Sequence, residues 1–170
     1  MSSAASDVYK RQTLDLAPTL PGFFPITIPV EKVTKLNCDG PGTPASVLLN
    51  QGTMFDPARD GEGFQITAQG DSAVYVITWY TYLNGQQVWL IGTGVQTGDT
   101  ITFDDLVITS GAEFGPGFDP DDVVRDPWGS LVLEYSDCNN ARATATPLPG
   151  QTAFEPFEVD VRKLVIGDCP

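Results

Sequence analysis

The stretch GTMFDPARDGEGFQITAQGDSAVYVITWYTYLNGQQVWLIGTG, residues 52–94, decides the fold. It contains a turn cluster of Asp, Pro and Gly and then two apolar runs separated by Asn84-Gly85. This dipeptide favours a two-residue type I′ turn, because both of its residues must adopt positive φ. Residues 73–83 and 86–95 are therefore predicted to form a β-hairpin.

Strand signals continue on both sides of this hairpin, with tight turns between them. Alternation of period two and β-branched residues predict strands over residues 47–55, 62–69, 100–108, 130–135, 141–146 and 157–164. With the hairpin, this makes about eight strands. The sequence therefore predicts an all-β fold, an antiparallel meander closed into a barrel-like domain, with a β-sandwich as the alternative.

One connection is long, residues 109–127, and it is dense in Gly, Pro and Asp. Within it, Asp119 is predicted to cap a short helical turn that begins at Pro120. The alternative is a calcium site, because carboxylate oxygens in one flexible loop are the ligands that Ca²⁺ prefers. The candidate metal ligands are Asp119, Asp121, Asp122 and Asp126. Their spacing differs from that of an EF-hand loop, and the sequence indicates no other cofactor.

The first twelve residues do not read as part of the fold. DVYKRQ, residues 7–12, is encoded by GAT GTG TAT AAG AGA CAG, a sequence used in transposase-based library adapters, and SSAAS fits the same adapter in frame. We interpret residues 1–12 as an untrimmed, unstructured adapter, so that the true start of the protein lies elsewhere. The alternative is a genuine polar N-terminus.

The two ends of the remaining chain resemble each other. Counted back from Cys38 and Cys169 without gaps, identical residues align: Pro25 with Pro156, Val30 with Val161, and Lys32 with Lys163. The period is roughly 130 residues, which is the size of a domain. We interpret residues 13–40 as the terminal strand of a truncated preceding repeat and residues 43–169 as one complete β-domain. Chance similarity of two strands is the alternative.

Three cysteines bear on the compartment. Cys138 and Cys169 are predicted to form a disulfide within the complete copy, and Cys38 would be the repeat equivalent of Cys169. A disulfide implies an oxidising environment, so we expect a secreted, periplasmic or cell-surface protein. Three buried thiols in a cytosolic protein are the alternative.

Composition excludes several classes of function. The net charge is −13, with 9 basic and 22 acidic residues, which argues against nucleic acid as a partner. No apolar run reaches the roughly 18–20 residues of a membrane span. The sequence has no His, so Ser-His-Asp and Cys-His triads are excluded and a zinc site is disfavoured.

Two groups of residues remain as candidate ligand-binding sites. Acidic residues surround Arg59 in the first turn, namely Asp56, Asp60 and Glu62, and Asp104-Asp105 form a second pair. Paired carboxylates could serve a hydrolase, although acids in turns ordinarily cap backbone N–H groups. The second group is aromatic: Trp79, Tyr80, Tyr82 and Trp89.

The aromatic residues divide between two faces of the predicted hairpin. Period two places Tyr75, Ile77 and Trp79 on one face, and Val76, Thr78, Tyr80 and Tyr82 on the other. One face must form the core, and an exposed aromatic row could stack on sugar rings. The alternation alone leaves open which face is which.

The motifs together resemble a family. Residues 52–64, Trp79-Tyr-Thr-Tyr82, Trp89-Leu-Ile-Gly92, Trp128-Gly129 and Asp137-Cys138-Asn139 are similar to an uncharacterised repeat domain of secreted bacterial proteins, with a G-x-W-[YF]-[DN]-P-x-x-x-G-x-G motif. Met54 stands where that motif has Trp. The resemblance covers most of residues 48–169 and implies a secreted repeat module, without implying any activity or site residue.

We therefore expect a non-enzymatic secreted or cell-surface β-module of a tandem-repeat protein, with a structural or adhesive role. The alternatives are a β-barrel that binds carbohydrate or a small ligand, and a two-carboxylate hydrolase. The expected partners are a glycan, another protein, or the neighbouring repeat copy.

Overall fold

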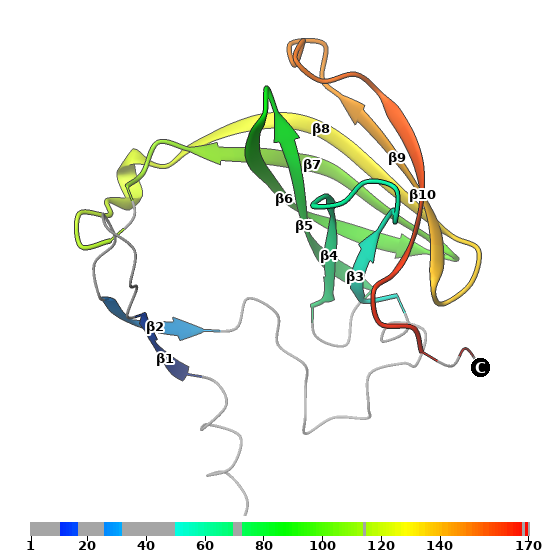
Figure 1. The fold of residues 1–170 in the computed structure, drawn as a ribbon, viewed down its shortest axis with the longest axis horizontal. Helices are drawn as coiled ribbons and strands as arrows, with labels where there is room; N and C mark the ends of the chain where they lie inside the picture. Colours follow the sequence, from blue (N-terminus) through cyan, green and yellow to red (C-terminus); the bar gives the residue numbers. More distant parts are fainter. Residues whose placement is uncertain are drawn as a thin grey trace, which may run out of the picture.

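The computed structural model describes residues 11–16, 26–31, 50–69, 73–113, 115–167 and 169. Eight strands close into an antiparallel barrel in the order β10-β3-β4-β5-β6-β7-β8-β9 (Figure 1). The predicted all-β, barrel-like meander of eight strands is confirmed, and a barrel is observed instead of a sandwich. The strands are β3 (Gly52–Phe55), β4 (Gly63–Ala68), β5 (Val74–Leu83), β6 (Gln86–Thr97), β7 (Thr100–Ser110), β8 (Val124–Tyr135), β9 (Asn140–Pro147) and β10 (Phe157–Lys163).

The central hairpin forms as predicted. β5 and β6 pair from Val74↔Val95 to Leu83↔Gln86, and the turn between them is Asn84-Gly85. Asn84 has φ 52° and Gly85 has φ 76°, as a type I′ turn requires. The hairpin is the longest regular ladder of the barrel, and it carries the predicted aromatic residues.

The connection between β7 and β8 is shorter than the sequence suggested. β7 runs on to Ser110 and β8 begins at Val124, six residues before the predicted start. Both strands have shifts of register near Leu106, which let the pair bend while it stays hydrogen-bonded. The predicted loop over residues 109–127 is therefore wrong at both ends, and residues 111–123 make the connection.

The barrel interior is filled by a chain of aromatic rings. Trp79 lies at its centre, with ring centroids 5.5 Å from Phe64, 5.1 Å from Trp128 and 5.4 Å from Phe157. Trp128 also meets the Phe154 ring edge-on at 5.6 Å. β6 leaves room for this filling at Gly94, where a Cβ would collide with the Phe103 ring. The interior is a packed core and not a ligand cavity.

Two strands before the barrel form a separate sheet. β1 (Arg11–Leu16) pairs antiparallel with β2 (Ile26–Glu31), and neither strand joins the barrel (Figure 1). The sequence predicted one strand in this region, and the structure has two. β1 begins at Arg11, so the last two residues of the adapter-like segment, which we expected to be unstructured, lie in a strand.

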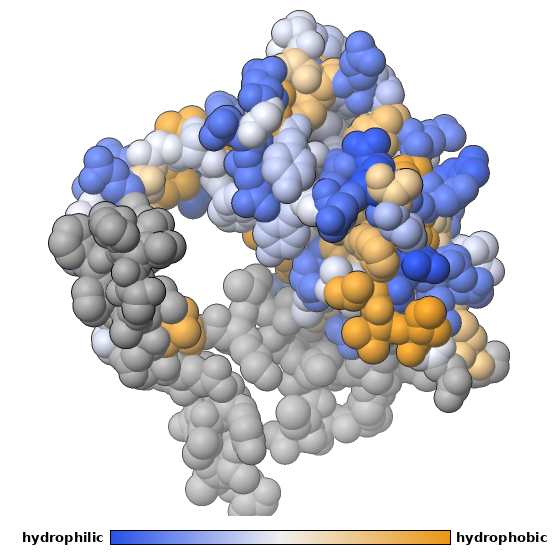
Figure 2. Space-filling model, viewed as in Figure 1, coloured by the Kyte–Doolittle hydropathy of each residue, from blue (hydrophilic) through white to orange (hydrophobic). Residues whose placement is uncertain are grey.

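The barrel is closed by β10 and β3 through a short ladder. Only Arg162↔Phe55 and Lys163↔Met54 pair, and the Leu164 amide then donates to the Thr53 carbonyl at 2.8 Å. Directly beyond this point the chain turns outward. Leu164, Val165 and Ile166 are 60, 80 and 69% exposed, and apolar surface lies where the tail leaves the barrel (Figure 2).

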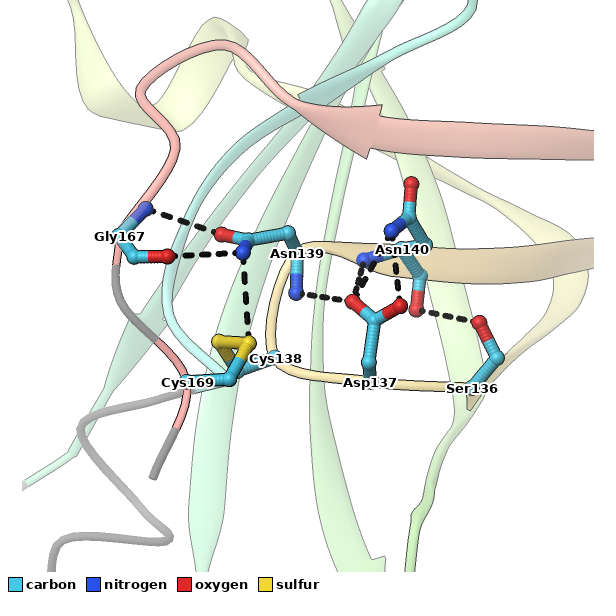
Figure 3. Close-up of a disulfide and its surroundings, with 7 residues drawn as sticks. All are labelled: Ser136, Asp137, Cys138, Asn139, Asn140, Gly167 and Cys169. Atoms are coloured by element: carbon cyan, nitrogen blue, oxygen red, sulfur yellow. Dashed lines mark hydrogen bonds between the residues drawn. A yellow bond between two sulfur atoms is a disulfide. The ribbon is translucent and has the colours of Figure 1, made fainter.

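A disulfide and one asparagine hold this tail. Cys138 and Cys169 are bonded, as predicted, and Asn139 forms two hydrogen bonds with the Gly167 backbone (Figure 3). The Asn139 carbonyl also accepts a hydrogen bond from the Lys163 amide at 2.7 Å. We call Cys138–Cys169 and Asn139 the C-terminal clamp.

The turn that carries the clamp is itself ordered by a carboxylate. Oδ1 of Asp137 accepts hydrogen bonds from the amides of Asn139 and Asn140, and both of its oxygens accept from the Asn140 side chain (Figure 3). These bonds, above all those from the Asn140 side chain, hold the pKa of Asp137 below its ordinary value. The β8–β9 turn therefore presents Cys138 and Asn139 in a defined orientation.

Removing the clamp should destabilise the barrel at its closing pair. The bridge spans a sequence separation of 31, for which the chain-entropy account gives about 3–4 kcal/mol. We expect a Cys138→Ser, Cys169→Ser double variant to lose stability of this order in urea unfolding. Cys38→Ser is the matched control and should unfold at the wild-type midpoint. Equal midpoints for the double variant and the control would contradict the role of the bridge.

Two buried tyrosines should make the fold sensitive to high pH. Burial raises the pKa of Tyr75 to about 12, and burial, followed by the charge of Tyr75, raises the pKa of Tyr135 further. Their hydroxyls donate to the Gln96 side chain at 2.6 Å and to the Asn50 carbonyl at 2.7 Å. In the unfolded chain these hydroxyls lose their protons near pH 10. The contribution of the two tyrosines to the free energy of unfolding is therefore fully present below about pH 10 and is lost as the pH rises beyond it.

We expect the unfolding free energy to fall by about 1.4 kcal/mol per pH unit for each of these tyrosines between about pH 10 and pH 12. Urea unfolding at stepped alkaline pH measures this slope. Tyr135→Phe should remove its share of the slope, whereas Tyr80→Phe, at an exposed position, is the control and should not. A wild-type slope in Tyr135→Phe would contradict the prediction.

Candidate functional site

The structure decides which of the candidate aromatics are core. Trp79 is 1% exposed and lies at the centre of the barrel, so its predicted role in ligand binding is replaced by a structural one. Tyr80, Tyr82 and Trp89 point outward and are 45, 49 and 43% exposed. About half of each ring is thus open to solvent, and the other half rests on the barrel.

The three outward rings lie together on two strands. Tyr80 is directly opposite Trp89, and Tyr82, two residues further along β5, is opposite Gln87. Residues in register on one face of an antiparallel pair have Cβ atoms about 4.5–5.5 Å apart, and the step from Tyr80 to Tyr82 is about 7 Å. The rings therefore form one compact group and not three isolated exposures.

The strands that carry these rings are uncharged, and the nearest acids in sequence to the Tyr82 ring are Asp60 and Glu62, on either side of Gly61. No residue of β4, β5 or β6 is Asp, Glu, Lys or Arg, in a protein whose net charge is −13. We call the outward-facing residues of these three strands the outer wall: Gly63, Gln65, Thr67, Val74, Val76, Thr78, Tyr80, Tyr82, Gln87, Trp89, Ile91, Thr93 and Val95. Residues of intermediate hydropathy lie over β5 and β6 in Figure 2.

Two glycines shape the wall beside its tyrosines. Gly63 is in register with Tyr80, so no side chain stands next to that ring on the β4 side. Gly61, with φ +82°, lies under Tyr82: a Cβ there would be 2.5 Å from the Tyr82 hydroxyl. A larger residue at position 61 would crowd the Tyr82 ring, whereas one at position 63 would collide with the Met54 carbonyl.

The predicted acidic group around Arg59 is brought together, but its atoms are already engaged. Glu62 accepts from Arg59 Nε and from the Thr81 hydroxyl, both at 2.6 Å, and its side chain is only 12% exposed. The Arg59 guanidinium lies over the Phe157 ring, 5.5 Å from its centroid. The hydrogen bond and charge of Glu62 outweigh partial burial and raise the pKa of Arg59.

This cluster acts as a plug at one end of the barrel. Asp56 uses Oδ1 to cap the Ala58 amide at 2.9 Å, which is the structural role expected of an acid in a turn. The cavity lined by Asp56, Arg59, Glu62 and Phe157 holds only about 10 Å³, enough for about one water molecule. This cavity therefore has no room for a substrate between the acids.

Of the four candidate calcium ligands, Asp119 caps a short helical turn. Asp119 precedes the 3₁₀ turn η1 (Pro120–Asp122), and its side chain accepts a hydrogen bond from the Asp121 amide at 2.9 Å. The predicted helical turn and its N-cap are thus observed. Asp126 lies on β8, in register with Ile108. Within the described parts of the chain, no group of three or more acidic or sulfur-bearing side chains could hold a metal ion.

A larger groove lies over β8, β9 and β10. It has a volume of about 480 Å³ and is lined by charged and polar residues, among them Glu134, Arg142, Asp160 and Arg162. Arg142 pairs with Asp160 at 3.0 Å, and this hydrogen bond and charge raise the pKa of Arg142. Arg162 lies over the Phe55 ring. The cationic groups are therefore paired with neighbours of the same surface.

Sequence reasoning missed two features of these sites. Thr81 looked like one more residue of an aromatic strand, yet it is 6% exposed and completes the bonding of Glu62. The uncharged wall did leave a signal in the sequence, because Asp71 is the only charged residue between positions 63 and 97.

No helix among the described residues has the length and apolar character to span a membrane.

Replacing Glu62 by Gln tests whether the plug is structural. The variant keeps the shape of the side chain but removes the charge that faces Arg59, so we expect a loss of about 1 kcal/mol in unfolding free energy. Asp60→Asn, at an exposed position in the same turn, is the control and should change stability by less than about 0.5 kcal/mol. Equal effects in the two variants would show that Glu62 has no structural role.

Comparisons with protein-family models, with curated proteins and with solved structures found no match to this chain. The resemblance of its motifs to a secreted bacterial repeat domain therefore stays a prediction. What the outer wall, the plug and the polar groove can bind is therefore inferred from their geometry. Of these three sites in the described chain, only the outer wall presents side chains without an evident role in the fold.

Proposed function

We propose that this chain is a non-enzymatic module of a secreted or cell-surface tandem-repeat protein, with an adhesive role. It binds its partner through the outer wall. The observation that carries this proposal is the group of three half-exposed rings, Tyr80, Tyr82 and Trp89, on a wall without charge. Large aromatic side chains supply contact area at low cost in conformational entropy, which is why they dominate binding surfaces.

The closed barrel supports a role in binding through side chains. Its eight strands close on one another, so the outer surface of the barrel is formed mainly by side chains and not by sheet edges. β5 and β6 pair with each other without a break from Val74↔Val95 to Leu83↔Gln86, which holds Tyr80 and Trp89 in place before a partner arrives. A surface that is rigid in advance loses little entropy on binding.

The repeat hypothesis gains support from the strands at both ends. β2 begins directly after Pro25 and β10 directly after Pro156, the prolines that the internal alignment pairs. A neighbouring copy of the domain is therefore one proposed partner. The disulfide supports a location in an oxidising compartment, which is the basis for proposing a secreted, periplasmic or cell-surface protein.

The outer wall can be tested without knowing its partner. We expect the wild-type protein to be retained on at least one of three immobilised supports: purified bacterial cell-wall sacculi, neutral polysaccharide beads, or collagen. A Tyr80→Ala, Tyr82→Ala, Trp89→Ala variant should lose that retention, because truncating an interface aromatic commonly costs more than about 1 kcal/mol. Wild-type Tm in the variant shows that the fold is intact.

Phe118→Ala is the matched control. Phe118 is 56% exposed and aromatic, but it lies in the connection between β7 and β8, away from the wall. Its loss should leave retention unchanged. If the triple variant binds every support as the wild type does, or if the wild type binds none of them, the proposed function is wrong.

A further inference from the structure

The chemistry of the outer wall also identifies the class of its partner. Resting on the proposed binding role of the wall, we infer that it binds a neutral polysaccharide, with pyranose rings stacked on Tyr80, Tyr82 and Trp89. The absence of charge, the shape of the surface and the polar side chains between the rings each support this ligand, and they do so independently.

The absence of charge on the wall distinguishes between charged and neutral ligands. A polyanion such as a nucleic acid or a uronic-acid polymer would meet a protein of net charge −13 at a wall without Lys or Arg. An anionic membrane would be repelled for the same reason. A charged protein partner would find no ion pair on the wall. When a neutral ligand binds to the wall, no charged group of either partner has to be removed from water, so the desolvation cost is low.

The shape of the wall distinguishes between small and polymeric neutral ligands. The wall is the outside of a closed barrel, the larger groove lies over β8–β10, and the cavity at the plug, which borders the wall at Gly63, holds only about 10 Å³. A small molecule needs a concave site that buries most of its surface. An extended chain can instead lie across the strands and contact several rings in turn. The direct Tyr80–Trp89 pair and the step of about 7 Å to Tyr82 provide such a series of contacts.

The polar members of the wall are suited to hydroxyl groups. Gln87 lies opposite Tyr82, and Gln65 and Thr78 lie opposite each other beside Tyr80 and Gly63. Amide and hydroxyl side chains both donate and accept, as sugar hydroxyls do. Gln65 already accepts from Thr53 through Oε1, which fixes the side chain and leaves its NH₂ group to donate. Flat rings with neutral hydrogen-bonding groups between them match a sugar ring, which is apolar on its faces and polar at its edge.

Affinity electrophoresis with soluble polysaccharides tests this inference. The native gels contain hydroxyethylcellulose, xylan, glucomannan or laminarin as neutral probes, and polygalacturonate as the acidic probe. We expect at least one neutral probe to retard the wild type and polygalacturonate to leave it unretarded. Trp89→Ala should weaken binding by about tenfold or more, and Trp89→Phe should recover part of it, because a ring is restored.

Tryptophan fluorescence gives a second readout on the same protein. Trp89 is exposed, whereas Trp79 and Trp128 are buried, so acrylamide quenching of the wild type reports mainly on Trp89. A bound neutral polysaccharide should protect it from quenching. The Phe118→Ala control should bind and be protected as the wild type is.

The inference fails if no neutral polysaccharide retards the wild type, if polygalacturonate binds as well as the neutral probes, or if Trp89→Ala binds normally. Retention on collagen through the wall, without binding to any polysaccharide, would overturn the glycan ligand and leave the proposed binding function intact. Failure of the triple variant to lose any retention would instead overturn the proposed function itself.

Discussion

Closure of the barrel by β10 and β3 is the constraint on which the rest of the structure depends. The two strands share only two paired positions, and β10 is the last strand of the chain while β3 is the first of the barrel. Without this contact the sheet would have two open edges and its inner face would meet water. The C-terminal clamp holds the chain just beyond β10, at Gly167 and Cys169, and so keeps the closing strand in place.

Once the sheet is closed, alternation along each strand sorts every side chain to the inside or the outside. Trp79 goes inward, where it joins the rings of Phe64, Trp128 and Phe157, and its neighbour Tyr80 must go outward. The interior is filled by this packing, and the plug at Arg59 fills the end. Any function must therefore lie on the outer surface or in the loops, which is where the side chains without a role in the fold are found.

Local chemistry explains what could be predicted from the sequence, and long-range contacts explain what could not. The Asn84-Gly85 turn, the strand pattern and the Asp119 cap depend on neighbours in the chain, and all three are observed. The inward face of β5 could not be assigned, because both faces of that strand carry aromatic residues and the register with distant strands decides between them. The bonds from Asn139 to Gly167 and from Thr81 to Glu62 join residues far apart in sequence, and they left no pattern to read.

The outer wall differs from the rest of the surface in what the fold requires of it. A strand that faces water needs side chains of good β-propensity, and Thr meets that need at Thr67, Thr78 and Thr93. Half-exposed Tyr and Trp also suit a strand, but they leave apolar ring surface in contact with water. The fold does not require the absence of charge, because the outer faces of β9 and β10 carry ion pairs. The wall therefore combines exposed rings with neutrality, and the proposed recognition of a neutral ligand would account for both.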